Sequence, residues 1–117
     1  MKKVYYLSTC DTCKRILKEV NLTSDFIKQD LKKEPLTEVQ LEELRALSQS
    51  YESLFNKRAK LYKERDLKSK SLSEPDYRNL LLEHYTFLKR PVFIIQDHIV
   101  IGNSKKTVEA LKQFLNE

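Results

Sequence analysis

The chain contains little glycine and little cysteine. Among its 117 residues one is glycine, three are proline and two are cysteine. So little glycine is typical of a helix-rich chain with few tight turns. A secreted disulfide scaffold spreads its cysteines along the chain to close long loops, whereas Cys10 and Cys13 lie in one short segment. In a reducing cytosol such a close pair is more often catalytic, redox-sensing or metal-binding.

Long apolar runs are also missing from the sequence. No run approaches the roughly 18 residues that a membrane span needs, so no membrane association is expected. The start, Met1–Leu7, is basic like that of a secretion signal, but its apolar stretch is shorter than the roughly 7 to 15 residues of such a signal. A first strand explains this segment better, and we expect a cytoplasmic protein.

Positive charge is concentrated in one segment. The chain has 22 basic and 17 acidic residues, which gives a formal net charge of +5. Residues 57–70 hold seven of the basic residues and two of the acidic ones, and so carry the whole excess. This segment could contact nucleic acid, an acidic partner or an anionic substrate, or it could be a solvated helix and loop. Its basic residues are Lys57, Arg58, Lys60, Lys63, Arg65, Lys68 and Lys70.

The N-terminal quarter of the chain predicts a strand, a helix and a second strand. Residues 3–7 are β-branched and aromatic enough for a short buried strand. Apolar residues at helical spacing predict a helix over 11–20 that ends at Asn21. A second strand is expected within 25–29, and this order of elements favours a βαβ unit with parallel strands.

The middle of the chain is predicted to be helical. Thr37 and Gln40 form a capping box in front of an apolar helix face, and a short second helix is expected near residue 50. Residues 73–76 have the pattern of another helix start, with a proline in the first turn. Apolar side chains continue along one side of this helix, which we expect to end at Pro91.

The C-terminal quarter predicts a hairpin and a last helix. Two apolar runs, 92–95 and 99–101, are separated only by residues 96–98, a short turn that includes His98. So short a connection demands antiparallel strands. With a helix over 104–115, the layout is β-α-β, a helical segment, and β-β-α. The sequence therefore predicts an α/β fold.

The cysteine pair lies where the first strand meets the first helix. Backbone N–H groups and the positive end of the helix dipole stabilise a thiolate there and lower the pKa of a cysteine from about 8.5. We expect Cys10 to be the attacking sulfur and Cys13, one turn further, to resolve a mixed disulfide. Lys14 and Arg15 add positive charge, whereas the Asp11 carboxylate would raise the pKa of a neighbouring thiol.

Two plainer interpretations of the pair stay open. The cysteines could be small buried residues of the core. They could also bind zinc, for which His84 and His98 are the remaining soft ligands. We predict no metal site, with His84 on a helix face and His98 in a turn.

Pro91 directly precedes an apolar strand. In this position it is a candidate cis-proline that packs against the thiol site and offers a backbone edge to a substrate. Arg90 would bring a cation to the same place.

Several short motifs in a fixed order resemble the ArsC-like family. This family comprises glutaredoxin-coupled arsenate reductases, Spx-type redox regulators and small thiol-reductase-like proteins. The resemblance implies a thioredoxin-like fold with a mixed four-stranded sheet, in a single domain over 1–117 with a helical insertion at about 35–89. The motifs are Tyr6-x-x-x-Cys10-x-x-Cys13-Lys14, Leu54-Phe55-Asn56-Lys57-Arg58, Arg90-Pro91-Val92 and Val100-Ile101-Gly102.

The resemblance carries over only part of the family's site. It implies Cys10 as the nucleophile and Arg90 as the group that binds an oxyanion beside it. Cys13 makes the motif more similar to the Spx and reductase-like branches than to arsenate reductases. The arginine that those reductases use after the final hairpin is absent from 102–104, and Arg58 is offset by two positions from their middle arginine.

These observations together predict a thiol oxidoreductase that reduces a disulfide, a glutathione mixed disulfide or an oxyanion. Arg90 would hold the anionic group of the substrate with help from Lys14, Arg58 and Pro91. No bound cofactor is expected, and the electron donor would be glutathione, glutaredoxin or thioredoxin. The alternative is an Spx-type redox regulator that binds RNA polymerase. Direct nucleic-acid binding has thin support, since Tyr62 is the only aromatic residue within 57–70.

Overall fold

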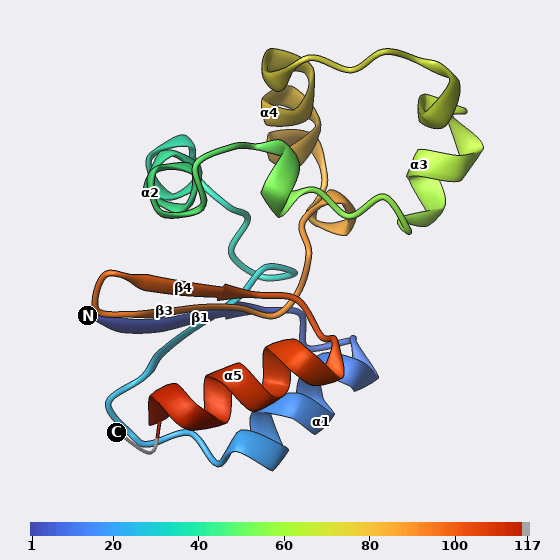
Figure 1. Cartoon of the computed structure of the whole chain (residues 1–117). Helices are drawn as coiled ribbons and strands as arrows, with labels where there is room; N and C mark the ends of the chain where they lie inside the picture. The colour runs from blue at the N-terminus through green and yellow to red at the C-terminus, as the bar shows by residue number, and fades with distance from the viewer. Residues whose placement is uncertain (116–117) are drawn as a thin grey trace. The chain divides into compact units, whose positions relative to one another are not determined.

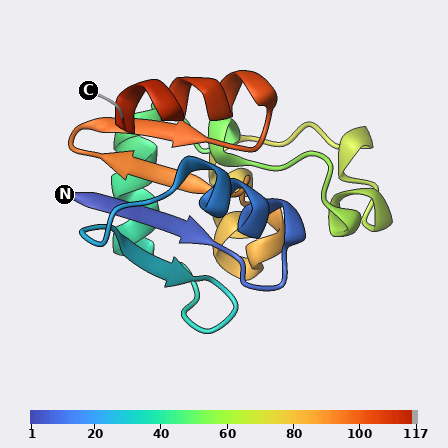
Figure 2. The same cartoon turned by 90° about the horizontal axis from the view of Figure 1, so that it is seen from below.

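The strands of the computed structural model, which describes residues 1–115, form one mixed sheet. Its order is β2-β1-β3-β4, in which β1 and β2 are parallel and the other neighbours antiparallel (Figure 2). This confirms the predicted α/β fold, its parallel β-α-β unit and its C-terminal hairpin. The strands are β1 (Lys2–Tyr6), β2 (Ile27–Asp30), β3 (Val92–Ile95) and β4 (His98–Ile101).

Two helices, α1 (Asp11–Val20) and α5 (Lys105–Leu115), lie side by side along one face of the sheet (Figure 1). Alternate residues of β1 and β3, such as Val4 and Phe93, point to this face and pack against Ile16 of α1. Burial of each large apolar side chain contributes about 1.5–3 kcal/mol. The buried cluster consists of Val4, Ile16, Val20, Phe26, Phe93, Ile95, Val100, Val108 and Leu111.

Helix α1 has the predicted bounds. It starts directly after Cys10, whose backbone is extended (φ −96°, ψ 110°). It ends at Asn21, which is left-handed (φ 53°) and donates its N–H to the carbonyl of Lys18. Asparagine tolerates this conformation better than most residues, so the predicted stop is confirmed together with its physical reason.

Backbone contacts divide the chain into two compact units. Unit 1 comprises Met1–Glu34 and the chain from Arg90 onward, and it contains the sheet. Unit 2 is Pro35–Lys89 and contains the remaining helices. That the chain forms a single domain with an insertion stays a prediction.

Unit 2 is built from short helices. Its two longer helices begin with capping boxes, Thr37 with Gln40 and Ser73 with Asp76, so both helix starts predicted from the sequence are confirmed. The helices are α2 (Glu38–Ser48), α3 (Lys60–Glu64) and α4 (Glu74–Glu83), with 3₁₀ turns η1 (Glu52–Leu54), η2 (Leu67–Ser69) and η3 (Tyr85–Phe87).

An aromatic cluster forms the centre of unit 2. The ring of Phe55 stacks on Phe87 at 5.3 Å and meets Tyr77 and Tyr62 edge-on at 4.9 and 5.8 Å. Phe55 also forms an isolated antiparallel bridge with Leu88. The bridge pairs the middle of unit 2 with its last residues, so Phe55 makes both side-chain and backbone contacts in this unit.

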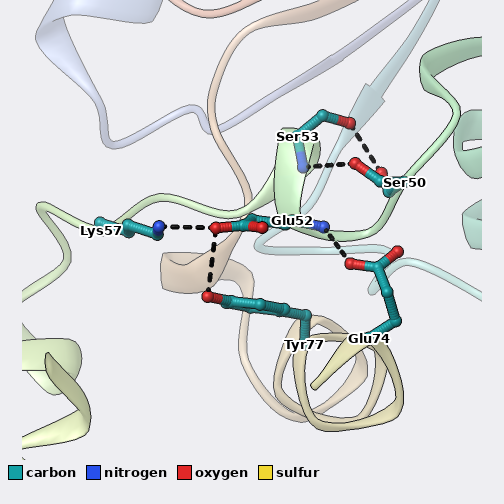
Figure 3. A network of polar contacts seen from close by, with 6 residues as sticks. All are labelled: Ser50, Glu52, Ser53, Lys57, Glu74 and Tyr77. Atoms are coloured by element: carbon teal, nitrogen blue, oxygen red, sulfur yellow. Dashed lines mark hydrogen bonds and ion pairs between the residues drawn. The ribbon is translucent and has the colours of Figure 1, made fainter. Parts of the chain in front are cut away.

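Polar contacts connect η1 with α4 (Figure 3). The Glu74 carboxylate accepts the backbone N–H groups of Tyr51 and Glu52 at 2.7 and 3.1 Å. The Glu52 carboxylate in turn accepts hydrogen bonds from Lys57 Nζ at 2.7 Å and from the Tyr77 hydroxyl at 3.4 Å. Glu74 therefore fixes the backbone of η1, whereas Glu52 and Lys57 pair on the surface.

The prediction that the helix starting at 73–76 runs to Pro91 is wrong. Helix α4 ends at Glu83, and His84 has extended backbone (φ −154°, ψ 137°). The imidazole Nδ1 of His84 accepts the N–H of Thr86 at 3.0 Å. This local hydrogen bond starts the η3 turn, so His84 caps a helix rather than occupying a helix face.

The turn of the C-terminal hairpin is also shorter than predicted. His98 belongs to β4, where it pairs with Ile95, and the loop consists of Gln96 and Asp97 alone. Gln96 adopts a left-handed conformation (φ 58°), which a two-residue hairpin loop of this kind needs. The ring of His98 packs against Phe114 at 4.8 Å.

Left-handed backbone occurs at non-glycine positions. Among the described residues, Asn21, Gln49, Asp66 and Gln96 have positive φ, as does the glycine, Gly102 (φ 97°). The chain thus adopts this conformation at helix ends and in the hairpin loop without glycine.

The basic segment 57–70 lies in unit 2 and spans α3 and η2. All seven of its basic residues are exposed. Lys57, Lys60 and Arg65 form ion pairs with nearby glutamates of the same unit. No helix within residues 1–115 has the length and apolarity to cross a membrane.

Candidate active site

Cys10 is held between β1 and α1 by backbone hydrogen bonds. Its N–H donates to the Leu7 carbonyl at 3.0 Å, and its own carbonyl accepts the N–H of Lys14 at 3.1 Å, which closes the first turn of the helix. The side chain is half-buried. The sulfur therefore lies at the positive end of the α1 dipole, as the sequence predicted.

The pKa of Cys10 lies below its usual value. Partial burial favours the neutral thiol and raises the pKa, but four groups outweigh it. They are the backbone N–H and the thiol of Cys13, the positive charge of Arg90, and the backbone N–H of Thr12. A thiolate, the reactive form of cysteine, is thus favoured at Cys10.

Cys13 has the opposite character. It is fully buried on the inner side of α1, and burial with the nearby Cys10 sulfur raises its pKa to about 11. The backbone of Leu7 hydrogen-bonds its sulfur as well. With this pKa Cys13 is a thiol at neutral pH, and its S–H donates a hydrogen bond to the Cys10 sulfur. Both cysteines are free.

Arg90 and Pro91 stand where unit 1 resumes after residues 35–89. The peptide bond between them is cis, which confirms the candidate assignment made from the sequence. Pro91 is buried, and its carbonyl accepts the N–H of Gly102 at 2.9 Å. Arg90 is half-buried, and its charge acts on both cysteine sulfurs.

The structure brings together some of the predicted site residues. Cys10, Cys13 and Arg90 interact with one another within unit 1. Lys14 is exposed on α1, and the cation that acts on the thiols is Arg90. Arg58 is exposed in unit 2, where its N–H donates to the side chain of Asn56. The roles of Lys14 and Arg58 at the site stay predictions.

Sequence reasoning missed Asp30, at the end of β2. This carboxylate is only 8% exposed, and its Oδ1 accepts the backbone N–H groups of Ser8 and Lys32, each at 3.1 Å. Burial alone would raise the pKa of Asp30, but the hydrogen bonds from Ser8 and Lys32 lower it on balance. One feature of the sequence could have pointed to Asp30. It stands at the carboxyl end of the strand parallel to β1, beside the loop that carries Cys10.

Metal ligation has no support in the described part of the chain. Within residues 1–115 no three histidine, cysteine or acidic side chains gather in a way that could hold a metal ion. His84 and His98, the remaining soft ligands, belong to different units.

Comparison with known protein families shows the family to which the chain belongs. The profile of the ArsC family matches residues 5–111, which include both cysteines, Arg90 and Pro91. The chain belongs to the ArsC family. This confirms the resemblance seen in the sequence, and family membership supports a thiol-oxidoreductase-like protein.

Solved structures agree with this assignment. The chain is similar to an ArsC family related protein from Bacteroides fragilis, with 24% identity, coverage of 94% of this chain and 96% of the other, and a TM-score of 0.74. It is also similar to an arsenate reductase related protein from Brucella melitensis (24% identity, coverage 93% and 92%, TM-score 0.70). An arsenate reductase from Vibrio cholerae has 15% identity, coverage of 95% of both chains and a TM-score of 0.72.

At these identities the structural likeness shows the fold of this ArsC family chain, which is thioredoxin-like with a mixed four-stranded sheet. No curated protein matches the sequence. The substrate therefore has to be inferred from the site itself.

Proposed function

We propose that the protein is a thiol oxidoreductase in which Cys10 is the nucleophile and Cys13 the resolving thiol. The observation that carries the proposal is the asymmetry of the pair. Cys10 is half-buried with a lowered pKa, whereas Cys13 is buried with a pKa of about 11. The Cys10 sulfur is thus the one that attacks the substrate, and Cys13 stays a protonated thiol until Cys10 has reacted.

The proposed reaction starts from a disulfide RS–SR′. The Cys10 thiolate attacks one sulfur, a Cys10–SR bond forms, the substrate S–S bond breaks, and R′S⁻ leaves and takes up a proton. Cys13 then loses its proton and attacks the Cys10 sulfur, which releases RS⁻, protonated in turn. The pair ends as a disulfide, oxidised by two electrons, and the substrate is reduced by the same two.

Arg90 is proposed to bind the anionic group of the substrate. Its guanidinium already stabilises charge at Cys10, and charge-assisted hydrogen bonds suit a carboxylate of glutathione or an oxyanion equally. Lys14 and the backbone at Pro91 are proposed as secondary contacts. A glutathione mixed disulfide, which offers both a disulfide and carboxylates, is the substrate class that we favour over arsenate.

The cycle needs an external reductant. We propose glutathione, glutaredoxin or thioredoxin, because each supplies the thiol that must break the Cys10–Cys13 disulfide. This choice does not require a bound cofactor.

The first experiment measures alkylation of the wild-type protein by iodoacetamide as a function of pH, with the labelled cysteine assigned by mass spectrometry. We expect label on Cys10 at neutral pH, an apparent pKa well below about 8.5, and almost no label on Cys13. An apparent pKa of Cys10 at or above about 8.5 would remove the basis of the proposal.

The second experiment compares arsenate, a glutathione mixed disulfide and a protein disulfide as substrates. Cys10→Ser should abolish turnover of all three. Cys13→Ser, the matched control, should lose turnover of protein disulfides and retain activity where an external thiol resolves the intermediate. No turnover with any substrate, together with redox-dependent retention of RNA polymerase, would favour the regulator instead.

A further inference from the structure

Asp30 is a buried carboxylate outside the cysteine motif. It ends β2 opposite Tyr6, the last residue of β1, and the N–H of Leu31 donates to the Tyr6 carbonyl at 2.8 Å. Its Oδ1 crosses to the loop after β1 and accepts the N–H of Ser8 at 3.1 Å. Its Oδ2 is buried with no hydrogen-bond partner among the described residues, so the bonds to Oδ1 are what holds this buried charge.

The loop that Asp30 holds is the one that positions both sulfurs. Ser8 follows Leu7, whose carbonyl accepts the N–H of Cys10 at 3.0 Å. The backbone of Leu7 also hydrogen-bonds the sulfur of Cys13. One short chain of bonded groups therefore runs from the Asp30 carboxylate through Ser8 and Leu7 to the two cysteines.

Asp30 is itself fixed from its other side. Its carboxylate accepts the N–H of Lys32, and its carbonyl accepts the N–H groups of Lys33 and Glu34 at 3.0 and 2.8 Å. The side-chain amide of Gln29, also buried, donates to the Glu34 carbonyl at 3.1 Å. The segment after β2 thus folds back on the end of the strand that carries Asp30.

We propose that Asp30 is a positioning residue for the cysteine pair, which holds the Leu7–Ser8 backbone in the place where it orients both sulfurs. The inference rests on the proposed function, because it concerns the reactivity of the same thiols. Asp30 touches neither sulfur and acts through Ser8 and Leu7.

If Asp30 acted only through its charge, its removal would change the reactivity of Cys10 in the opposite direction to a loss of positioning. A negative charge near the site raises the pKa of a thiol, so its removal would make Cys10 more reactive at neutral pH. Loss of positioning makes Cys10 less reactive, because the sulfur leaves its backbone donors. The direction of the change therefore separates the two roles.

The test uses full-length Asp30→Ala, Asp30→Asn and Asp30→Glu, with Asp25→Asn as the matched control. Asparagine keeps an acceptor oxygen at the same place without the charge, whereas glutamate keeps the charge and moves the oxygens. Asp25 precedes β2 at its other end, where it is exposed and paired with Lys2 at 3.1 Å.

Alkylation of Cys10 is measured at a pH below its apparent pKa. We expect the rate to fall about three- to tenfold in Asp30→Ala and Asp30→Glu, which corresponds to a partial loss of thiolate where one pKa unit is a factor of ten. Asp30→Asn and Asp25→Asn should stay within about twofold of wild type. If Asp30→Ala does not fold, the comparison of the Cys10 alkylation rates of Asp30→Glu and Asp30→Asn tests the inference.

Unchanged or faster alkylation in Asp30→Ala and Asp30→Glu would overturn the inference. So would an equal loss in Asp30→Asn, since that variant keeps the acceptor. A wild-type Cys10 with an ordinary pKa would instead refute the proposed function, so the two failures are distinguishable. Thermal melting of each variant shows whether a slower reaction merely follows lower stability.

Discussion

The two units place their charged side chains in different surroundings. In unit 1 the Asp30 carboxylate is 8% exposed and bonds to backbone N–H groups, and Cys13 is fully buried. In unit 2 the Glu52 and Lys57 side chains pair at 2.7 Å while each stays 51% exposed. Backbone donors in a buried place can control protonation, whereas an exposed ion pair is screened by water and salt. We interpret the buried groups of unit 1 as part of its chemistry and the exposed ion pair of unit 2 as an ordinary surface contact.

The apolar interiors differ as well. Unit 1 packs mainly aliphatic side chains between the sheet and its two helices. In unit 2 the ring of Phe55 contacts three other rings and the residue also takes part in the backbone bridge. A residue on which so many contacts converge should be sensitive to a single substitution.

The largest effect is therefore expected from Phe55→Ala. Removal of the ring should destabilise the protein by about 3–5 kcal/mol, as is usual for a buried aromatic residue. Urea unfolding measures the change, with Phe55→Leu as the milder control. A loss below about 1 kcal/mol would show that the cluster can close around the cavity.

Glu74→Ala should have the next largest effect. It leaves the N–H groups of Tyr51 and Glu52 without their carboxylate acceptor, which should cost about 1–2 kcal/mol. Glu74→Gln keeps one acceptor oxygen and should lose less. Equal losses in the two variants would assign the effect to the charge rather than to the hydrogen bonds.

Asp30 should give a smaller effect that depends on pH. Because its folded-state pKa is lowered, it stabilises the protein above its unfolded pKa of about 3.9, and this contribution disappears as the pH falls through the folded pKa. Wild type should thus lose more stability than Asp30→Asn between neutral pH and that acidic range. Parallel curves of stability against pH for the two proteins would contradict the buried, hydrogen-bonded carboxylate.

The smallest effect is expected from Lys57→Met. The exposed pair with Glu52 should contribute little, and any change in the unfolding midpoint should vanish when salt is added. A clear destabilisation that persists at high salt would show that this surface pair resembles the buried contacts of unit 1.

Much of the fold follows from local patterns in the sequence. The β-α-β unit, the starts of α2 and α4 and the hairpin were predicted, since each depends on spacing and on short-range hydrogen bonds. The end of α4 was not, because apolar residues continue at helical spacing past Glu83, while the His84 imidazole diverts the backbone. The hairpin turn was misjudged because glutamine gives no sign of the positive φ that Gln96 adopts.

The site residues that belong to a short sequence motif were predicted, and the one that belongs to no motif was not. Cys10 and Cys13 stand out through their spacing, and Arg90 through the proline that follows it. Asp30 has no motif, since its role arises only when two parallel strands place it next to Ser8. Its position beside the thiol loop depends on the sheet rather than on neighbours in the sequence.

The left-handed residues of this glycine-poor chain bear on its unfolded state. Replacement of Gln49 or Gln96 by glycine would relieve backbone strain of about 1–2 kcal/mol in the folded protein. It would also let the unfolded chain visit many more conformations, a penalty of about 0.4–1 kcal/mol. Asparagine at position 21 incurs less of the strain and keeps the unfolded chain equally restricted. The turns thus offset part of their folded-state strain by limiting the freedom that the chain gains when it unfolds.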